Sequence, residues 1–280
     1  MLELLLRSRK FIGGLAVVVT IIMFGIIGPM VTRNPQATDL PRNQPPSWEY
    51  PLGTTSFGED VFAQLCTGIR NSLFVGLLGG GLGTLFAVLF GALGSYKGGW
   101  ADEASNFVTN VIMVFPVLPL LLFLAYVLQQ RSLFLVGLLI ALTGWPWAAR
   151  CVRSQVLSLK EREFVNLARI SGMKDRTTVI TEVLPNMLAY ILMVFVLLAG
   201  GAIIAEAGMS AVGVGPDRFQ CATLGNMIFS AIQYHPGVPH WSYIWWWFIP
   251  PGLVLTMLLS VIFVLHAGMD EVFNPRLRRV

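Results

Sequence analysis

Long runs of apolar residues, almost free of charge, recur along the chain and dominate its pattern. The first run extends from Phe11 to Met30 and contains no ionisable side chain. Each run is close to the ~20 residues that a helix needs to cross the hydrocarbon core of a bilayer. The runs lack the alternation of a membrane β-barrel, so helices must satisfy the backbone groups in lipid. The predicted spans are 11–30, 72–96, 104–128, 132–149, 187–205 and 243–268.

These runs predict an all-α membrane protein with about six transmembrane helices in a single domain, residues 1–280. Composition agrees, because 55% of the residues are hydrophobic and only 12% are charged, whereas about 25% are charged in soluble proteins. A cleaved signal peptide is an alternative for the first run, because Arg7, Arg9 and Lys10 precede it. The run is longer than a usual signal sequence and no small-x-small cleavage site follows it, which favours a retained helix.

Basic residues predict which way the helices are inserted, because cytoplasmic loops carry an excess of Lys and Arg. With the N-terminus inside, fourteen of the 19 basic residues lie in cytoplasmic segments. The five outside are Arg33, Arg42, Arg70, Arg131 and Arg218. Both termini are therefore expected in the cytoplasm, with 150–186 as a cytoplasmic loop and 31–71 and 206–242 as extracytoplasmic loops. The basic pI indicates this topology and contact with membrane lipid, and gives no reason to expect nucleic acid.

Several residues within or beside the spans suggest how the helices are used. Gly76 and Gly80, like Gly79 and Gly83, stand four apart, a spacing that lets helices approach closely. The partner helix would belong either to this chain or to a second subunit. Pro116 and Pro119 interrupt the third span, so this region is expected to face protein or a water-filled cavity, unless it is a plain kink. Glu206, at the outer end of the fifth span, either lines a solute entrance or accepts hydrogen bonds from the loop.

The remaining polar residues offer little chemistry. No span carries an ionisable residue near its centre, which argues against an ion-driven carrier or a voltage sensor. A membrane enzyme would need His, Asp or Ser groups converging at one depth, so no catalytic residue is predicted. His235 and His240 lack a nearby Cys or acid, so no metal site is expected. Cys66 and Cys221 both fall outside, and their pairing is not determined by sequence.

The last polar loop leads into a group of tryptophans at the start of the final span. Their positions fit an aromatic belt at the membrane–water interface, where amphipathic rings lie at the level of the headgroups. The residues of this predicted belt are Trp241, Trp245, Trp246 and Trp247.

The cytoplasmic loop contains the most informative segment. Residues 163–172 predict a short amphipathic helix that ends at Gly172, with Phe164, Leu167 and Ala168 on one face. A second short helix is expected from Asp175 to Leu184. A helix pair between two membrane spans would dock into a groove on a soluble partner. The alternative is a helix that lies on the membrane surface.

The loop resembles the EAA loop of ATP-binding-cassette importer permeases. That loop reads Glu-Ala-Ala, three residues, Gly, and then Leu-Pro at a fixed distance. This chain has Asn166-Leu167-Ala168, Gly172 and Leu184-Pro185 at the same spacing, although the first two letters of the triplet differ. Residues 156–163 are similar to the C-type subunit of the dipeptide/oligopeptide/nickel permeases. That subgroup commonly has an acid where Thr55 stands and Arg where Glu59 stands. Further similar segments are 51–60, 95–100, 205–207, 212–215, 224–227 and 270–276.

The resemblance implies a type I importer permease that forms half of a solute pathway in the cell membrane of a prokaryote. Its partners would be a homologous permease subunit, two cytoplasmic ATPases and an extracytoplasmic solute-binding protein. ATP and Mg would be bound by the ATPases, because this chain has no phosphate loop and needs no cofactor of its own. The residues expected to couple to an ATPase are Glu163, Phe164, Asn166, Leu167, Ala168, Arg169 and Gly172.

The expected solute is a dipeptide or oligopeptide, with oligosaccharide or nickel as alternatives. The solute-binding protein, a separate chain, would largely set the specificity. A self-sufficient channel or secondary transporter is the alternative from another class. Its mark would be a charged residue inside a span, and no predicted span has an ionisable residue near its centre.

Overall fold

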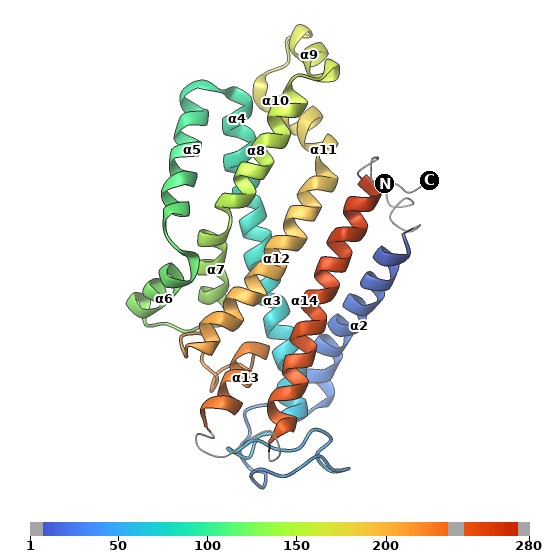
Figure 1. Cartoon of the computed structure of the whole chain (residues 1–280), viewed down its shortest axis with the longest axis vertical. Helices are drawn as coiled ribbons and strands as arrows, with labels where there is room; N and C mark the ends of the chain where they lie inside the picture. The colour runs from blue at the N-terminus through green and yellow to red at the C-terminus, as the bar shows by residue number, and fades with distance from the viewer. Residues whose placement is uncertain (1–7, 235–243, 274–280) are drawn as a thin grey trace.

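The computed structural model describes residues 8–234 and 244–273, which form an elongated bundle of helices (Figure 1). No regular β-strand occurs within these residues, as the predicted all-α fold requires. The long elements are α2 (Arg9–Val31), α3 (Val61–Val88), α5 (Gly99–Val114), α6 (Val117–Leu128), α7 (Leu133–Gly144), α8 (Pro146–Lys160), α12 (Leu188–Ala211), α13 (Leu224–Gln233) and α14 (Trp245–Phe273). The short elements are α4 (Gly94–Lys97), α9 (Glu163–Ile170), α10 (Asp175–Thr178), α11 (Leu184–Asn186) and two π-helical turns at Leu89–Leu93 and Val179–Val183.

The described helices account for the expected number of membrane spans. Four are long and apolar enough to cross a bilayer: α2, the continuous helix from α3 through α4, α12 and α14. Two further pairs pass the same test together but are bent, by 84° between α5 and α6 and by 47° between α7 and α8. The total is up to six if each bent pair is one span, in agreement with the prediction of about six.

Helix ends differ from the apolar runs where a cap or a proline sets them. α3 begins at Val61, well before the expected start at residue 72, because Asp60 accepts a hydrogen bond from the Phe62 N–H at 2.8 Å and caps the helix. The expected span 104–128 is divided at Phe115 and Pro116, as a proline without an N–H favours. Beyond residue 149, α8 continues as far as Lys160.

The glycines of α3 pack against α12 of the same chain. A Cβ atom placed on Gly80 would lie 2.8 Å from the Cα of Ala199, and one on Gly79 would lie 2.7 Å from the Cβ of Ala202. Gly76 similarly faces Ile203, at 3.0 Å. Of the two alternatives for these glycines, the structure therefore shows packing within the chain, where small residues bring two backbones together.

The two ends of the bundle are distinct. The first turn of α2 and the last turns of α14 lie at the same end as α9, whereas α13 lies at the opposite end (Figure 1). Lys10 and Glu271 form an ion pair there, with Nζ and Oε2 3.0 Å apart. We refer to these regions as the α9 end and the α13 end.

The predicted tryptophan belt is wrong for two of its members. Trp246 and Trp247 are only 6% and 1% exposed, because they cover the segment that precedes α3. The indole Nε1 of Trp246 donates a hydrogen bond to the carbonyl oxygen of Thr54, 3.2 Å away. Trp245 remains 41% exposed, and Trp241 lies outside the described residues.

Candidate functional site

Helix α9 projects at one end of the bundle, between α8 and α10 (Figure 1). It ends at Gly172, whose φ of +78° is in the left-handed region that glycine adopts readily. The Gly172 N–H donates to the Arg169 carbonyl at 3.0 Å, and the Met173 N–H donates to the Ala168 carbonyl at 3.1 Å. These bonds close the last turn in the way a C-terminal glycine permits. The short helix predicted for residues 163–172 is therefore present.

The two faces of α9 differ in exposure, and not in the way that the apolar pattern suggested. Val165 and Ala168 are 0% and 8% exposed, with Phe164 half-buried beside them. Leu167 and Ile170 are 63% and 84% exposed. Successive helical residues are about 100° apart, so 164, 165 and 168 share the inward arc and 167 falls outside it. Ala168 is therefore a packing residue, and Leu167 is the one available for contact.

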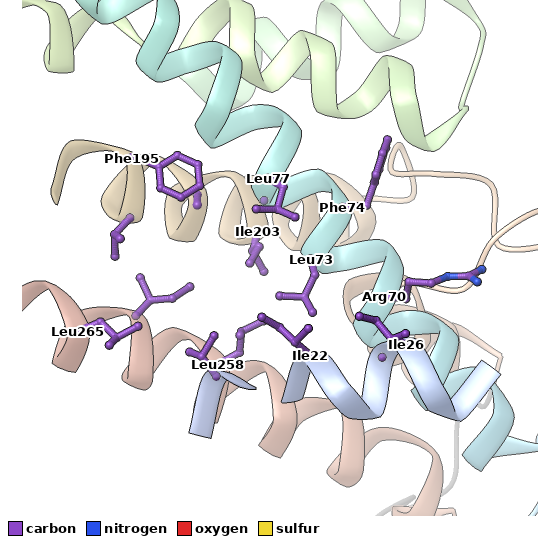
Figure 2. Close-up of a pocket in the computed structure, with 16 residues that line it drawn as sticks. Ile22, Ile26, Arg70, Leu73, Phe74, Leu77, Phe195, Ile203, Leu258 and Leu265 are labelled. Atoms are coloured by element: carbon purple, nitrogen blue, oxygen red, sulfur yellow. The ribbon is translucent and has the colours of Figure 1, made fainter. Parts of the chain in front are cut away.

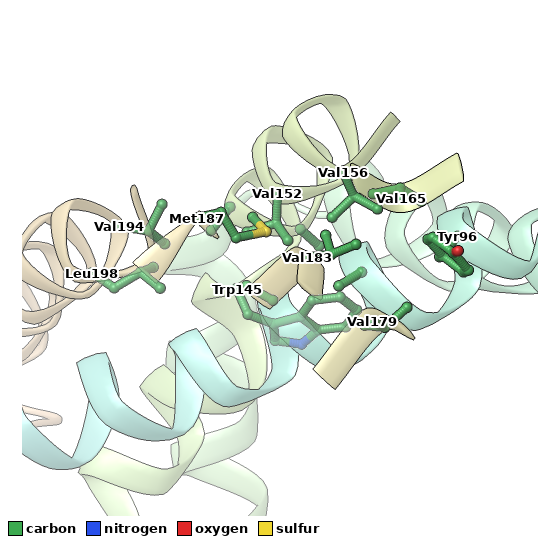
Figure 3. Packing of buried hydrophobic residues seen from close by; sticks show 14 residues of the cluster. Tyr96, Trp145, Val152, Val156, Val165, Val179, Val183, Met187, Val194 and Leu198 are labelled. Atoms are coloured by element: carbon green, nitrogen blue, oxygen red, sulfur yellow. The ribbon is translucent and has the colours of Figure 1, made fainter. Parts of the chain in front are cut away.

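A buried apolar cluster anchors α9 to the bundle (Figure 3). Val165 enters this cluster from α9, and Trp145 stacks on Phe90 with ring centroids 4.5 Å apart. The cluster joins residues from α3, α4, α8, α9, the π-helical turns and α12. Its larger labelled members in Figure 3 are Tyr96, Trp145, Val152, Val156, Val165, Val179, Val183, Met187, Val194 and Leu198. A displacement of α9 would therefore be passed through this cluster to α8 and α12.

Polar contacts hold the base of α9 in place. The guanidinium of Arg169 lies 5.3 Å from the ring centroid of Tyr96, and its Nε donates to the Tyr96 hydroxyl at 3.3 Å. The Lys160 ammonium lies 5.6 Å from the same ring. Arg153 on α8 forms a two-pronged ion pair with Asp102 on α5, with N–O distances of 2.8 and 2.7 Å. Arg169 is thus a positioning residue rather than a free contact.

Three of the other predicted coupling residues lie at or near the exposed face. Glu163 and Asn166 are both exposed and lie in the turn of α9 that precedes Leu167. Gly172 has no atom within 4 Å of the place a Cβ would occupy, so its requirement for glycine comes from φ and not from space.

The second predicted helix of the loop, Asp175 to Leu184, is present in a less regular form. It runs as α10, a π-helical turn at Val179–Val183 and α11. Val179 and Val183 are 1% and 0% exposed and belong to the cluster under α9. The π-helical turn, a rare element that interrupts α-helices, could not be read from the apolar pattern.

The predicted pathway residues are not brought together. Pro116 and Pro119 are exposed on the bend between α5 and α6. Beside them, Val117 lines a small apolar cavity of about 190 Å³ against α7 and α12. Glu206 is fully buried and accepts hydrogen bonds from the hydroxyls of Ser210 at 2.8 Å and Thr223 at 2.7 Å. Of the two alternatives for Glu206, a solute entrance or an acceptor of hydrogen bonds from the loop, this geometry fits the second.

At the α13 end, Glu59 forms an ion pair that sequence reasoning did not find. Its Oε2 lies 2.9 Å from Nη2 of Arg218, and the two side chains are only 3% and 12% exposed. Thr55 donates a further hydrogen bond to Glu59 at 2.9 Å, and the ring of Phe57 lies 4.0 Å from the guanidinium. The available signal was the acid at position 59, where the similar subgroup has Arg, because a buried acid requires a basic partner.

Within the described residues, the structure holds neither a cluster of metal-ligating side chains nor a disulfide. No group of three or more His, Cys, Asp or Glu able to hold a metal occurs in residues 8–234 and 244–273. His235 and His240 lie outside them. Cys66 and Cys221 are both free thiols, and burial raises the pKa of Cys221 to about 11.

Comparison with known proteins places this arrangement in context. Residues 68–279 match the model of the binding-protein-dependent transport system inner membrane component family. The chain belongs to this family. It is 30% identical over 279 residues to the oligopeptide transport system permease protein OppC of Bacillus subtilis (strain 168), covering 98% of this chain and 88% of that protein. It is 28% identical over 274 residues to the dipeptide transport system permease protein DppC of Alkalihalophilus pseudofirmus, covering 97% and 88%.

A solved structure supports the same fold. A chain of the MetNI methionine ABC transporter, in inward-facing conformations, aligns with a TM-score of 0.59 at 16% identity. The alignment covers 77% of this chain and 97% of that chain. The resemblance of this transport component to importer permeases, first indicated by the loop around Gly172, is thereby confirmed.

Proposed function

We propose that this chain is the permease subunit of an ATP-driven importer of dipeptides or oligopeptides, forming half of the solute pathway. The names of its relatives support the solute class. The observation that carries the coupling role is the exposure of Leu167 and Ile170 on a helix whose opposite face is buried. An apolar surface held rigidly outside the bundle is suited to a groove on a soluble partner.

The mechanism follows from the way α9 is anchored. An ATPase that binds the exposed Leu167 and Ile170 would move α9 together with Val165 and the buried cluster that Val165 enters. Because packed apolar interiors do not deform continuously, α8 and the adjoining half of α12 would move as one body. Such a rigid-body movement opens and closes a pathway alternately, and the residues of this chain carry out no bond-breaking step.

The partners and orientation belong to the same proposal. The α9 end and both termini would face the cytoplasm and two ATPases, which bind ATP and Mg. The α13 end would face a solute-binding protein outside the cell. A homologous permease subunit would cover the exposed bend at Pro116 and Pro119, where backbone groups freed by proline need protein or water.

The coupling role is tested with Leu167→Asp in the complex purified in mild detergent. The variant should keep the sister permease subunit but lose most of its ATPases, because a charge replaces an exposed apolar contact. Val212→Asp is the matched control, since Val212 is 57% exposed and follows the last residue of α12 as its C-cap, away from α9. Equal retention of the ATPases in both variants would refute the role of α9.

Transport itself separates the proposal from a self-sufficient channel. The full complex in liposomes should take up peptide only with ATP inside the compartment that holds the ATPases. Uptake by the purified chain alone would overturn the proposal. The solute class is read from the binding protein, whose thermal unfolding should be delayed by peptides and not by oligosaccharide or nickel.

A further inference from the structure

Two cavities of opposite character adjoin at Arg70, near the α13 end. The first is an apolar slot of about 490 Å³ between α2, α3, α12 and α14 (Figure 2). The second is a polar pocket of about 360 Å³ formed by residues 29–36, the adjoining turns of α3 and residues 220–221. Arg70 lines both cavities. In Figure 2 it lies at one end of the slot, with its guanidinium pointing away from the apolar side chains.

The slot exists because α2 touches different helices at its two ends. A Cβ on Gly25 would lie 3.0 Å from Ile69 of α3, and one on Gly14 would lie 3.1 Å from Leu265 of α14. Between these close contacts, Ile22 faces a gap that is bounded by apolar side chains. The slot is open on one side, since Leu77, which lines it, is 62% exposed.

The polar pocket has the properties of an anion site. Arg33 and Arg70 are exposed, and neither guanidinium has a hydrogen-bond or ion-pair partner among the described residues. None of the residues that line the pocket is acidic. Thr67 also lines the polar pocket and is only 5% exposed. Its buried hydroxyl has no hydrogen-bond partner within the described part of the chain. A buried hydroxyl without a partner is costly, so a ligand that accepts its hydrogen bond would be favoured.

We propose that these cavities together bind one anionic phospholipid, with an acyl chain in the slot beside Ile22 and the phosphodiester between Arg33 and Arg70. The Thr67 hydroxyl would donate to a phosphate oxygen. A soluble anion would occupy only the polar pocket, whereas a lipid fills both and joins them at the residue that they share. The proposed orientation places this lipid in the outer leaflet, but the site itself does not depend on that orientation or on the transported solute.

The test measures lipid retained by the intact complex, by native mass spectrometry after titration with phosphatidylglycerol or phosphatidylcholine. Arg70→Gln should weaken binding of phosphatidylglycerol about fivefold, the ratio that corresponds to the ~1 kcal/mol contributed by a basic residue near anionic lipid. Arg42→Gln is its control, an exposed arginine that lines neither cavity. Ile22→Trp should abolish retention by filling the slot, whereas Met23→Trp, its exposed neighbour, should not. Thr67→Val should weaken it less than Arg70→Gln.

Three results would overturn the proposal. The first is equal retention of phosphatidylcholine and phosphatidylglycerol, since the site would then not recognise negative charge. The second is binding of chain-free glycerophosphoglycerol as tight as that of the lipid, which would mean a soluble anion site. The third is loss of the sister subunit, rather than of lipid, in Ile22→Trp, which would make the slot a subunit interface. All three readouts are independent of peptide uptake, so they do not stand or fall with the importer proposal.

Discussion

The α13 end and the α9 end are held together by different balances of physical forces. At the α13 end, buried charges and hydrogen bonds add to an apolar cluster around Trp247, with Glu59 paired to Arg218 and Glu206 accepting from Ser210 and Thr223. At the α9 end, a continuous apolar cluster around Trp145 carries the packing. Hydrogen bonds are directional and lose their energy when their geometry changes, whereas apolar burial is not directional.

This difference indicates which end of the bundle is expected to move when the proposed pathway opens and closes. A network of buried polar groups tolerates one arrangement, because each group left unpaired is penalised in full. An apolar cluster has no directional bonds to lose, so it can move as one body with the helices that it joins. The α13 end is therefore expected to remain rigid while the α9 end shifts, with α3 and α12 linking the two. Three substitutions probe this contrast, each on a different part of that path.

The largest effect is expected at the α13 end from Glu59→Ala. The substitution leaves Arg218 charged and only 12% exposed with no ion-pair partner. Breaking a buried pair in this way lowers the free energy of unfolding by about 3 to 5 kcal/mol. Thermal unfolding of the detergent-solubilised complex measures it, with Asp39→Ala, an exposed acid on the same segment, as the control. If both variants melt together, the ion pair does not secure this end.

The second effect is expected midway along the bundle from Gly80→Ala. The added methyl group would lie 2.8 Å from the backbone of Ala199, so α3 and α12 must separate, at a cost of about 1 to 3 kcal/mol. Gly81→Ala is a sharp control, because nothing lies within 4 Å of its Cβ position. That variant should gain up to about 1 kcal/mol from helix propensity. Opposite shifts in melting temperature are therefore predicted, and shifts of the same sign would contradict close packing at Gly80.

Much of the fold could be predicted from the sequence, because apolar length alone specifies membrane helices. The short helix ending at Gly172 was also predictable, since glycine at a helix end and an apolar period are local signals. Which face of α9 is buried was not. Leu167 and Ala168 are adjacent in a short pattern, and only the positions of α8, α10 and the π-helical turn at Val179–Val183 decide that Ala168 turns inward.

The long-range polar contacts were the least predictable part of the candidate site. Glu59 and Arg218 are far apart in the chain, and a single sequence carries no information that pairs them. The tryptophan pattern at Trp246 and Trp247 is the same whether lipid or a loop of the protein covers the side chains, so the sequence does not distinguish the two cases. Their burial depends on the path of the segment before α3, which has no periodic pattern to predict it.

The smallest effect on stability is expected at the α9 end from Val165→Ala. Val165 is 0% exposed, and the loss of its two methyl groups costs about 1.5 kcal/mol at ~0.8 kcal/mol per buried carbon. Val114→Ala, at a position that is 77% exposed, is the matched control and should change stability by less than about 0.5 kcal/mol.

The order of the functional effects should be the reverse of the order of the stability effects. Loosening the only buried valine of α9 would let the helix move without moving α8, so ATP would be hydrolysed with less peptide taken up per cycle. Glu59→Ala, in contrast, should lower the amount of folded complex while the surviving fraction keeps its ratio of uptake to hydrolysis. The ratio measured in liposomes therefore separates an end that transmits movement from one that resists it, and an unchanged ratio in Val165→Ala would remove the basis for the contrast.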